Sequence, residues 1–372
     1  MKAVKQIYPL TSLRFFAAVF VVLHHTIEAI YPAITLPGWQ NRLQQYSGVT
    51  VLLFFILSGY VLAIAYLEEG RTVERKRFWI ARFARIYPLY FVTLVDAPNL
   101  YHYRLLKYGA KAALLKTSIS FAGSTLLLQQ WFPRLRGIDF PNWSLCVEAL
   151  FYLLFPFVGS QLWRLRLATQ CNLALALFFT LFGIQYVGGR WGIDPFAYLQ
   201  PVSSLPYFVA GIVLRRIQLW IRQDTIRFAR WQLASPWLAL LIVAVLAIAC
   251  ASPRKIDTAI VPGLLFLPGF SLLLLCFSGG NRRMEAAFSR PTLVLLGESS
   301  YSLYLLHMIV WAWFFAYARL PLNVATYFLY LAAAILLSIA SFRFLEVPAR
   351  RRILRAWQQR SPESEVVASL AQ

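Results

Sequence analysis

Long apolar stretches recur along the whole chain, and short segments rich in Arg and Lys separate them. A helix needs about 20 apolar residues to cross the hydrocarbon core of a bilayer. The apolar stretches predict membrane spans at 10–30, 47–67, 78–96, 143–160, 171–188, 197–214, 235–251, 260–278, 293–317 and 322–345. We therefore predict an all-α fold, a polytopic transmembrane helical bundle with about ten spans.

The basic residues between the spans predict how the chain is oriented, because Lys and Arg favour cytoplasmic loops. We place the N-terminus, with Lys2 and Lys5, in the cytoplasm. The same side then receives the basic segments at 68–77, 161–170, 215–234 and 279–292 and the tail after Glu346. This placement of the basic segments requires that the run 112–130 does not cross the membrane as an eleventh span. The run then lies at the interface, within a long outer segment from about 97 to 142. Both termini are then cytoplasmic.

The composition also indicates a membrane protein. Of the 372 residues, 59% are hydrophobic and only 14% are charged, against about 25% charged residues in an average soluble domain. The net charge of +21 lies mostly in the segments between spans, so we expect membrane lipids, and no nucleic acid, as partners. The four cysteines stand alone without ligand-like spacing, and we predict no metal site. Residues 1–352 form one predicted membrane domain, followed by a short polar cytoplasmic tail at 353–372.

The first apolar run, "LTSLRFFAAVFVVLHHTIEAI", contains three ionisable residues. Arg14 and His25 are eleven positions apart, which places them within about 20° on one helix face and roughly 16 Å apart along the axis. Ionisable groups inside a bilayer are costly and mark functional sites. A neutral imidazole also serves as a base near pH 7. The pattern favours function for His25, whereas His24, about 100° away, is more typical of packing.

The third run opens with "RFWIARFARIYP", in which Arg82 and Arg85 share one helix face. These arginines fit two interpretations equally well. They anchor the helix at the headgroups, with their side chains snorkelling outward, or they clamp a phosphate, since guanidinium groups bind phosphate bidentately.

A polar stripe also follows "PNWSLCVEALFYLLFP", where Ser144, Glu148 and Tyr152 lie on one helix face. A carboxylate one turn into a span is expensive, so we expect Glu148 to face a cavity or a cation.

A second stripe lies in "GESSYSLYLLHMIVW". Ser300, Tyr304, His307 and Trp311 fall within about 40° of each other, and Glu298 precedes them. Packing explains the aromatics at least as well as function does. His307 and Glu298 favour function because they are ionisable.

Six stretches in order resemble acyltransferase family three, the bacterial membrane O-acyltransferases, from about residue 8 to 352. They are "LTSLRFFAAVFVVLHH", "LLFFILSGYVLA", "RFWIARFARIYP", "NWSLCVEALFYLLFP", "GESSYSLYLLH" and "FRFLEVPARR". The resemblance implies a multi-pass protein of the bacterial inner membrane that moves an acyl group, usually acetyl, from cytoplasmic acyl-CoA to a carbohydrate hydroxyl. The acceptors of the family include O-antigen, exopolysaccharide, Nod factor, peptidoglycan and macrolide-type products.

The family's motifs carry over to particular residues of this chain. Its Arg-then-His pattern matches Arg14 and His25, its Arg-x-x-Arg pattern matches Arg82 and Arg85, and its Trp-Ser-Leu and Glu pattern matches Trp143, Ser144 and Glu148. The expected catalytic residues are His25, Glu148 and His307. The expected donor-binding residues are Arg14, Arg82 and Arg85, and the expected substrate-binding residues are Ser144, Trp143, Tyr304 and Glu298. Acetyl-CoA is expected as donor substrate, with no tightly bound cofactor and with glycan-assembly proteins as candidate partners.

Two other classes of protein compete with this interpretation. A transporter or flippase of a lipid-linked or polar substrate also has many spans and buried charges. It often shows paired halves or broken helices, and the sequence shows no twofold symmetry. A non-catalytic assembly subunit would tolerate loss of Arg14 and His25. For the enzyme, a covalent acyl-histidine and direct transfer both remain open, with Glu148 orienting the imidazole or holding the acceptor.

Overall fold

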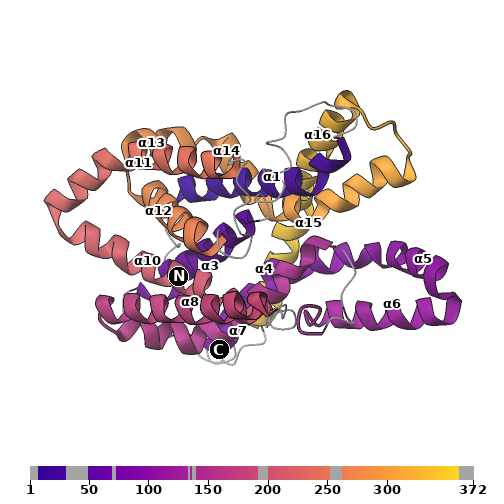
Figure 1. Cartoon of the computed structure of the whole chain (residues 1–372), viewed down its shortest axis with the longest axis horizontal. Coiled ribbons are helices and arrows are strands. Elements are labelled where there is room, and N and C mark those ends of the chain that lie inside the picture. The colour runs from indigo at the N-terminus through magenta and orange to yellow at the C-terminus, as the bar shows by residue number, and fades with distance from the viewer. Residues whose placement is uncertain are drawn as a thin grey trace, which may run out of the picture.

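The computed structural model describes residues 7–30, 49–68, 73–132, 135, 140–191, 200–251 and 262–359. Within these residues all regular secondary structure is helical, which confirms the predicted all-α class (Figure 1). The loop at 31–48 and residues 360–372 of the predicted tail lie outside the described residues.

The described residues of the N-terminal half form eight helical elements. They are α1 (Tyr8–Ile30), α3 (Thr50–Tyr66), α4 (Arg75–Thr93), η3 (Leu94–Asp96), α5 (Ala97–Tyr108), α6 (Ala110–Thr125), η5 (Phe140–Asn142) and α7 (Trp143–Arg164). The ambiguous run at 112–130 lies largely in α6, which forms a hairpin with α5 at one end of the molecule (Figure 1).

The C-terminal half begins with α8 (Leu167–Arg190), α9 (Gln200–Ser203), α10 (Leu205–Gln223), α11 (Thr225–Ala251), the π-helical η6 (Pro262–Phe266) and α12 (Leu267–Ser278). It continues with α13 (Arg282–Phe288), α14 (Pro291–Glu298), α15 (Ser300–Trp311), the π-helical η7 (Ala312–Tyr317), α16 (Val324–Ser341), the π-helical η8 (Phe342–Glu346) and α17 (Val347–Gln359). The predicted boundary at residue 352 falls inside α17.

Membrane-spanning candidates are fewer than the sequence predicts. In the described part of the chain five helices are long and apolar enough to cross a bilayer, or seven if each of two bent pairs is one span. The five are Arg75–Tyr108, Trp143–Arg164, Leu167–Gly188, Thr225–Ile248 and Val324–Gln359. The count of about ten is not confirmed. Helices α1 and α10 are outside this set and carry ionisable residues within their bounds, and α3 has only 17 residues.

Two predicted segments differ in the structure. The segment 215–234, expected as a basic loop, is helical except at Asp224, because α10 continues to Gln223 and α11 begins at Thr225. The single span expected at 293–317 is two helices, α14 and α15, bent by 60° at Ser299. Helix α14 packs directly on α1, where a Cβ at Gly297 would lie 2.0 Å from the carbonyl oxygen of Thr11.

Helices α3 and α10 cross with their backbones in contact. A Cβ at Gly59 would lie 2.0 Å from the carbonyl oxygen of Phe208, and one at Gly211 would lie 1.9 Å from that of Ile56. Only glycine fits at this crossing. Small residues that let backbones approach are a common means of joining helices in membranes, where burial of apolar surface gives no driving force.

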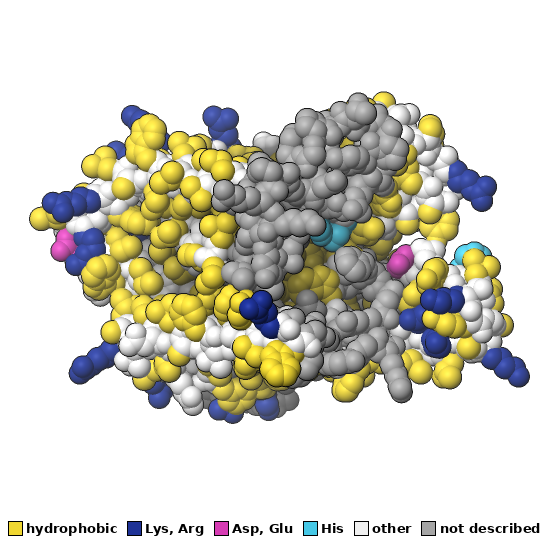
Figure 2. Space-filling view, in the orientation of Figure 1, with side chains coloured by type: hydrophobic (Ala, Val, Ile, Leu, Met, Phe, Trp, Pro, Cys, Tyr) yellow, Lys and Arg dark blue, Asp and Glu magenta, His cyan; other side chains and the backbone are white. Residues whose placement is uncertain are grey.

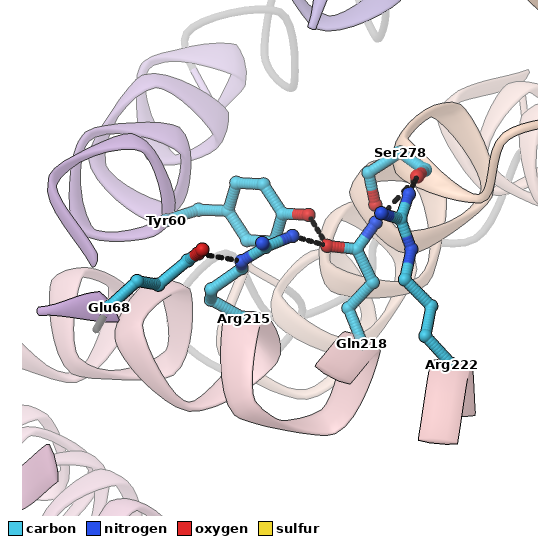
Figure 3. Close-up of polar contacts among 6 residues, drawn as sticks. All are labelled: Tyr60, Glu68, Arg215, Gln218, Arg222 and Ser278. Carbon is cyan, nitrogen blue, oxygen red and sulfur yellow. Dashed lines mark hydrogen bonds and ion pairs between the residues drawn. The ribbon is translucent and has the colours of Figure 1, made fainter. Parts of the chain in front are cut away.

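A buried polar network fixes the neighbouring ends of α3, α10 and α12 (Figure 3). The Nε of Arg215 donates to Glu68 at 2.5 Å, and its Nη1 donates to Gln218. Gln218 also accepts from the Tyr60 hydroxyl and donates 2.5 Å to the carbonyl oxygen of Ser278. Arg222 donates to the same carbonyl at 3.0 Å. The buried guanidinium of Arg215 is therefore matched by a carboxylate and an amide oxygen, as a structural ion pair requires.

Apolar side chains cover much of the outer surface of the described residues. In the view of Figure 2, hydrophobic side chains fill broad areas of the visible face, and Lys and Arg lie mainly towards its edges. Trp237 on α11, Phe328 on α16 and Leu175 on α8 are more than half exposed. A soluble protein rarely exposes such large apolar areas, so this surface fits contact with lipid.

Candidate functional site

A cavity of about 780 Å³ lies between α1, α3, α4, α7, α14, α15 and α17. Six arginines and two glutamates are among its lining residues: Arg14, Arg82, Arg85, Arg343, Arg350, Arg351, Glu148 and Glu298. Hydroxyl groups complete the polar lining, from Thr11, Ser58, Ser144, Tyr152, Ser300, Tyr301 and Tyr304. The cavity therefore carries an excess of positive charge and is suited to an anionic ligand.

Arg82 shows how incompletely these charges are matched. Its Nη2 donates to the Tyr66 hydroxyl at 3.3 Å, and its guanidinium carbon lies 5.6 to 5.8 Å from the ring centres of Tyr66, Phe78 and Tyr152. Its Nε is buried with no hydrogen-bond partner among the described residues. A buried donor left unsatisfied is costly, especially on a charged group, and this one lies on a cavity wall where a ligand can satisfy it.

The arginines of the cavity also differ from Arg215 in their ion pairs. Within the described ranges, Arg14, Arg82 and Arg85 form no ion pair with a carboxylate, whereas Arg215 is paired with Glu68. Arg215, whose role is structural, thus has a carboxylate partner. The three arginines that line the cavity have no such ion-pair partner. Convergent arginines of this kind bind phosphate or carboxylate groups.

Glu148 lies on the cavity wall formed by α7, and its carboxylate is held by two hydroxyl groups. The Tyr152 hydroxyl and the Ser58 hydroxyl both donate to its Oε1, the second at 3.3 Å. Arg14 is among the charges that interact with this carboxylate. The predicted polar stripe is confirmed as geometry, because Ser144, Glu148 and Tyr152 all line the cavity.

Ser144 and Tyr304 form a hydrogen-bonded layer at one end of the cavity. The Tyr304 hydroxyl donates to the carbonyl oxygen of Pro141 at 2.8 Å, and its oxygen lies 2.7 Å from the Ser144 hydroxyl. Both side chains are buried, and the Phe54 ring packs beside Tyr304. We call these two residues the Ser–Tyr layer. His307, one turn further along α15, is not among the residues that line the cavity.

Beyond this layer, the structure brings His25 of α1 and His307 of α15 into direct contact. The Nδ1 of His25 lies 2.8 Å from the Nε2 of His307, and the two ring planes are nearly parallel, 6° apart, with their centres separated by 5.1 Å. The Nδ1 of His307 lies 2.8 Å from the carbonyl oxygen of Tyr304 and 3.2 Å from that of Leu303. His307 is fully buried, so these contacts fix its ring.

The carbonyl oxygens define which nitrogens of the histidine pair carry hydrogen. A carbonyl only accepts, so the Nδ1 of His307 donates to it and the Nε2 of a neutral His307 accepts. The Nδ1 of His25 must therefore donate to His307. A neutral His25 then has its lone pair on Nε2, which is the arrangement that a general base needs.

The remaining predicted residues divide between the cavity and its surroundings. Glu298 lines the cavity at the end of α14. Trp143 packs edge-on against Phe55, which lines the cavity, but Trp143 itself is not among the lining residues. Trp311 packs against Tyr330, and the His24 ring centre lies 5.0 Å from that of His25.

Sequence reasoning missed Arg343, Arg350 and Arg351, which η8 and α17 bring to the cavity. Their signal was present in "FRFLEVPARR". Basic residues that follow an apolar span are expected as orienting charges, however, so nothing in the sequence separated these arginines from that background.

Helical structure throughout the described regular elements, an apolar outer surface and an arginine-lined cavity beside a histidine pair define a membrane protein with a cavity suited to an anionic ligand. Residues 7–343 match the family model described as an acyltransferase domain, so the chain belongs to that acyltransferase family.

Named relatives agree with this family. The chain is 26% identical over 323 residues to the acyltransferase MdmB of Streptomyces mycarofaciens, covering 81% of this chain and 78% of that protein. It is 24% identical to a Staphylococcus aureus protein predicted to be an O-acetyltransferase, covering 83% of this chain and 53% of the relative. It is 23% identical to the peptidoglycan O-acetyltransferase OatA of Listeria monocytogenes, covering 82% of this chain and 51% of that protein. The chain thus spans about half the length of these two O-acetyltransferases. No solved structure matches the chain.

Proposed function

We propose that the chain is a membrane O-acetyltransferase that moves an acetyl group from acetyl-CoA to a hydroxyl group of a carbohydrate acceptor. The acyltransferase family and the O-acetyltransferase names of two relatives support this class. The observation that carries the proposal is the His25–His307 pair, which holds a basic imidazole nitrogen one helical turn beyond an arginine-lined cavity.

Coenzyme A suits the cavity because it is a polyanion with a long uncharged arm. Arg14, Arg82 and Arg85 would hold its diphosphate, and the buried Nε of Arg82 would gain an acceptor. The pantetheine arm would then extend along α1 towards His25, which lies on the same face as Arg14 about 16 Å further along the axis. To reach His25 the thioester has to pass the Ser–Tyr layer.

In the proposed reaction His25 acts as general base. Its Nε2 takes the proton from the acceptor hydroxyl while the hydroxyl oxygen attacks the thioester carbonyl carbon. The tetrahedral intermediate collapses as the carbon–sulfur bond breaks. The thiolate of CoA leaves and takes the proton back from His25, so the products are the acetyl ester and free CoA. His307 keeps the Nδ1 of His25 engaged as a donor throughout and stabilises the imidazolium that forms.

A covalent route uses the same atoms. The Nε2 of His25 attacks the thioester first, and CoA leaves as its thiolate. The acceptor hydroxyl then attacks the acetyl carbonyl carbon, the bond to the imidazole breaks, and the hydroxyl proton passes to the thiolate. Incubation with acetyl-CoA without acceptor, followed by rapid acid quench and mass spectrometry, separates the two routes. An acetyl group on the peptide that contains His25 selects the covalent route. Its repeated absence, with full coverage of that peptide from an active preparation, selects direct transfer.

The acceptor we propose is a glycan of the bacterial cell envelope, such as O-antigen, exopolysaccharide or peptidoglycan. One relative is named for peptidoglycan, and carbohydrate hydroxyls are acceptors for O-acetylation. The protein would then lie in the cytoplasmic membrane with the cavity mouth facing the acetyl-CoA of the cytoplasm. It would work beside the proteins that assemble the glycan.

One observation favours a second candidate function, transport of a lipid-linked or polar substrate. The described residues contain two bent helix pairs, α12 with α13 at 95° and α14 with α15 at 60°, and broken helices are common in transporters. Release of free CoA separates the two classes. An acetyltransferase forms one CoA for each ester, whereas a transporter consumes no thioester.

The test of the proposed function is ester-linked acetate on envelope and secreted glycans. Cells lacking the gene are complemented with wild type or with His25→Ala, and equal amounts of both proteins in the membrane are verified. We expect wild type to restore base-labile acetate, and His25→Ala to reduce the rate by about 10²-fold or more, as removal of a general base does. A wild type that adds no ester to any glycan would contradict the proposed acceptor class. Equal restoration by both proteins would remove His25 from the mechanism.

A further inference from the structure

Helix α17 brings arginines to the mouth of the cavity. Arg350 and Arg351 both line the cavity and are exposed, whereas Arg14, Arg82 and Arg85 are half-buried deeper inside it. Arg350 interacts electrostatically with Arg82 and Arg85, so three guanidinium groups from α4 and α17 converge. Within the described ranges, Arg350 forms no ion pair with a carboxylate, although the Glu346 carboxylate interacts with it electrostatically.

The position of α17 is fixed by polar contact with α15. The Ser302 hydroxyl donates to Glu346, the last residue of the π-helical segment η8. π-helical turns are rare and frequently occur at functional sites. The segment η8 joins the apolar α16 to the basic α17. Two of its own residues, Phe342 and Arg343, line the cavity. The orientation of the α17 arginines is therefore built into the fold.

We propose that Arg350 and Arg351 bind the 3′-phosphate of the CoA donor and make the enzyme selective for the phosphorylated coenzyme. This inference rests on the proposed function, because it assumes that acyl-CoA is the donor. It assigns to α17 a binding role that is separate from the role of Arg14, Arg82 and Arg85.

The order of the groups along the donor matches the order of the residues along the cavity. In acyl-CoA the thioester is followed by the pantetheine arm, then the diphosphate, then the ribose with its 3′-phosphate. The histidine pair lies outside the cavity beyond the Ser–Tyr layer, Arg14, Arg82 and Arg85 are the half-buried arginines of the lining, and Arg350 and Arg351 are exposed arginines of the lining. The outermost phosphate of the donor thus falls at the outermost arginines.

The charge of the 3′-phosphate also fits this position. A phosphomonoester carries about −1.5 to −2 charge near pH 7 and offers three strong acceptor oxygens. Each phosphate of the diphosphate carries only about one charge. Arg350 and Arg351 are both exposed and both line the cavity, so together they supply about the charge of a phosphomonoester and the planar donor geometry that arginine provides.

The experiment compares the binding of CoA and of 3′-dephospho-CoA to the purified full-length protein in lipid nanodiscs. Calorimetry measures both dissociation constants for wild type, for Arg350→Ala with Arg351→Ala, for Arg85→Ala and for Arg355→Ala. Arg355 is the matched control, because it lies on the same helix, is exposed and does not line the cavity.

We expect wild type to bind CoA at least about tenfold more tightly than 3′-dephospho-CoA, as loss of a charge-assisted contact predicts. The Arg350/Arg351 variant should bind CoA about tenfold more weakly, while its affinity for 3′-dephospho-CoA stays unchanged. Arg85→Ala should weaken the binding of both ligands, and Arg355→Ala should leave the binding of both unchanged.

Equal affinity of wild type for the two ligands would overturn the inference and leave acyl-CoA as donor. An equal loss of affinity for both ligands in the Arg350/Arg351 variant would also overturn it. The two arginines would then affect binding of the whole coenzyme or the stability of the fold. Binding of neither ligand by wild type would contradict the proposed donor itself, and the inference would fail with it.

Discussion

At the scale of single residues, the hydrogen bond from His307 to the backbone defines the tautomer of a neutral His25. The Tyr304 carbonyl forces hydrogen onto the Nδ1 of His307, and His307 in turn forces hydrogen onto the Nδ1 of His25. A backbone carbonyl cannot titrate, so it fixes this tautomer more firmly than an ionisable side chain would. His307 is thus a positioning residue in the proposed mechanism.

This role predicts different results for two substitutions of His307. His307→Gln keeps an acceptor oxygen for the Nδ1 of His25, whereas His307→Ala removes it. We expect His307→Ala to lower kcat by about 10- to 100-fold, a smaller loss than that from His25→Ala, and His307→Gln to recover much of the rate.

The readout is kcat against pH together with KM for acetyl-CoA. Loss of the hydrogen-bond acceptor for His25 should change the dependence of kcat on pH. It should leave the KM for acetyl-CoA near that of wild type, because His307 does not line the cavity. Equal loss in both variants with an unchanged pH profile would indicate a purely structural role.

Within one helix, the sequence alone predicted much of the site. The shared face of Arg14 and His25 and the stripe of Ser144, Glu148 and Tyr152 follow from helical periodicity, and the structure places the stripe along the cavity. The contact of His25 with His307 joins residues 282 positions apart. Helical periodicity says nothing about which faces meet, so both histidines were candidates but their pairing was not predictable.

At the scale of helices, the crossing of α3 and α10 depends on two glycines. Each backbone occupies the space where the other helix would place a Cβ, as the distances at Gly59 and Gly211 show. This crossing supports the polar network of Figure 3 and also positions α3, which lines the cavity through Ser58 and Phe54.

The crossing predicts that Gly211→Ala destabilises the protein. The added methyl would lie 1.9 Å from a backbone oxygen, which cannot rotate away, so the helices must separate. We expect the free energy of unfolding to fall by about 1–3 kcal/mol or more. Gly183→Ala on α8 is the matched control, because nothing lies within 4 Å of its Cβ position.

Thermal unfolding of the detergent-solubilised variants measures both effects. Gly183→Ala should leave stability unchanged or raise it by up to about 1 kcal/mol, since Ala is the better helix former. Equal stability of Gly211→Ala and wild type would show that the two helices can part without cost.

Helix boundaries were harder to predict where charge and apolar character coincide. Arg215, Arg216 and Arg222 suggested a loop, yet all three belong to α10. Arg215 is tolerated inside the helix because Glu68 and Gln218 satisfy it; Gln218 lies three residues further along the same helix, whereas tertiary structure brings Glu68 to it. Similarly, the break at Ser299 reflects the packing of α14 on α1, which is invisible in the local apolar pattern.

At the scale of the whole molecule, the cavity has two chemically different ends. Exposed arginines of η8 and α17 line one part of it, and the buried Ser–Tyr layer lines another. Because basic residues favour the cytoplasmic face, the mouth is predicted to open there. The number of spans was less predictable, since several helices are short, bent or charged.

The orientation predicts which positions react with a membrane-impermeant maleimide in intact cells. The native cysteines are first replaced, and then Arg355→Cys on α17 and Lys111→Cys on α6 are made separately; both side chains are exposed. We expect Lys111→Cys to be labelled in intact cells, and Arg355→Cys only after permeabilisation. Labelling of Arg355→Cys in intact cells would reverse the orientation and place the cavity mouth outside.

The Ser–Tyr layer has a consequence for the energy supply of the cell. A water-accessible cavity lined by six arginines would conduct chloride or other anions if it opened through to the far side of the membrane, and the membrane potential would collapse. Ser144 and Tyr304 line the cavity and the two histidines do not, so the hydrogen bonds among Ser144, Tyr304 and the Pro141 carbonyl are placed to prevent such a leak. In the proposed reaction the thioester has to pass this layer, so the donor itself would fill the opening and acyl transfer would proceed without a leak.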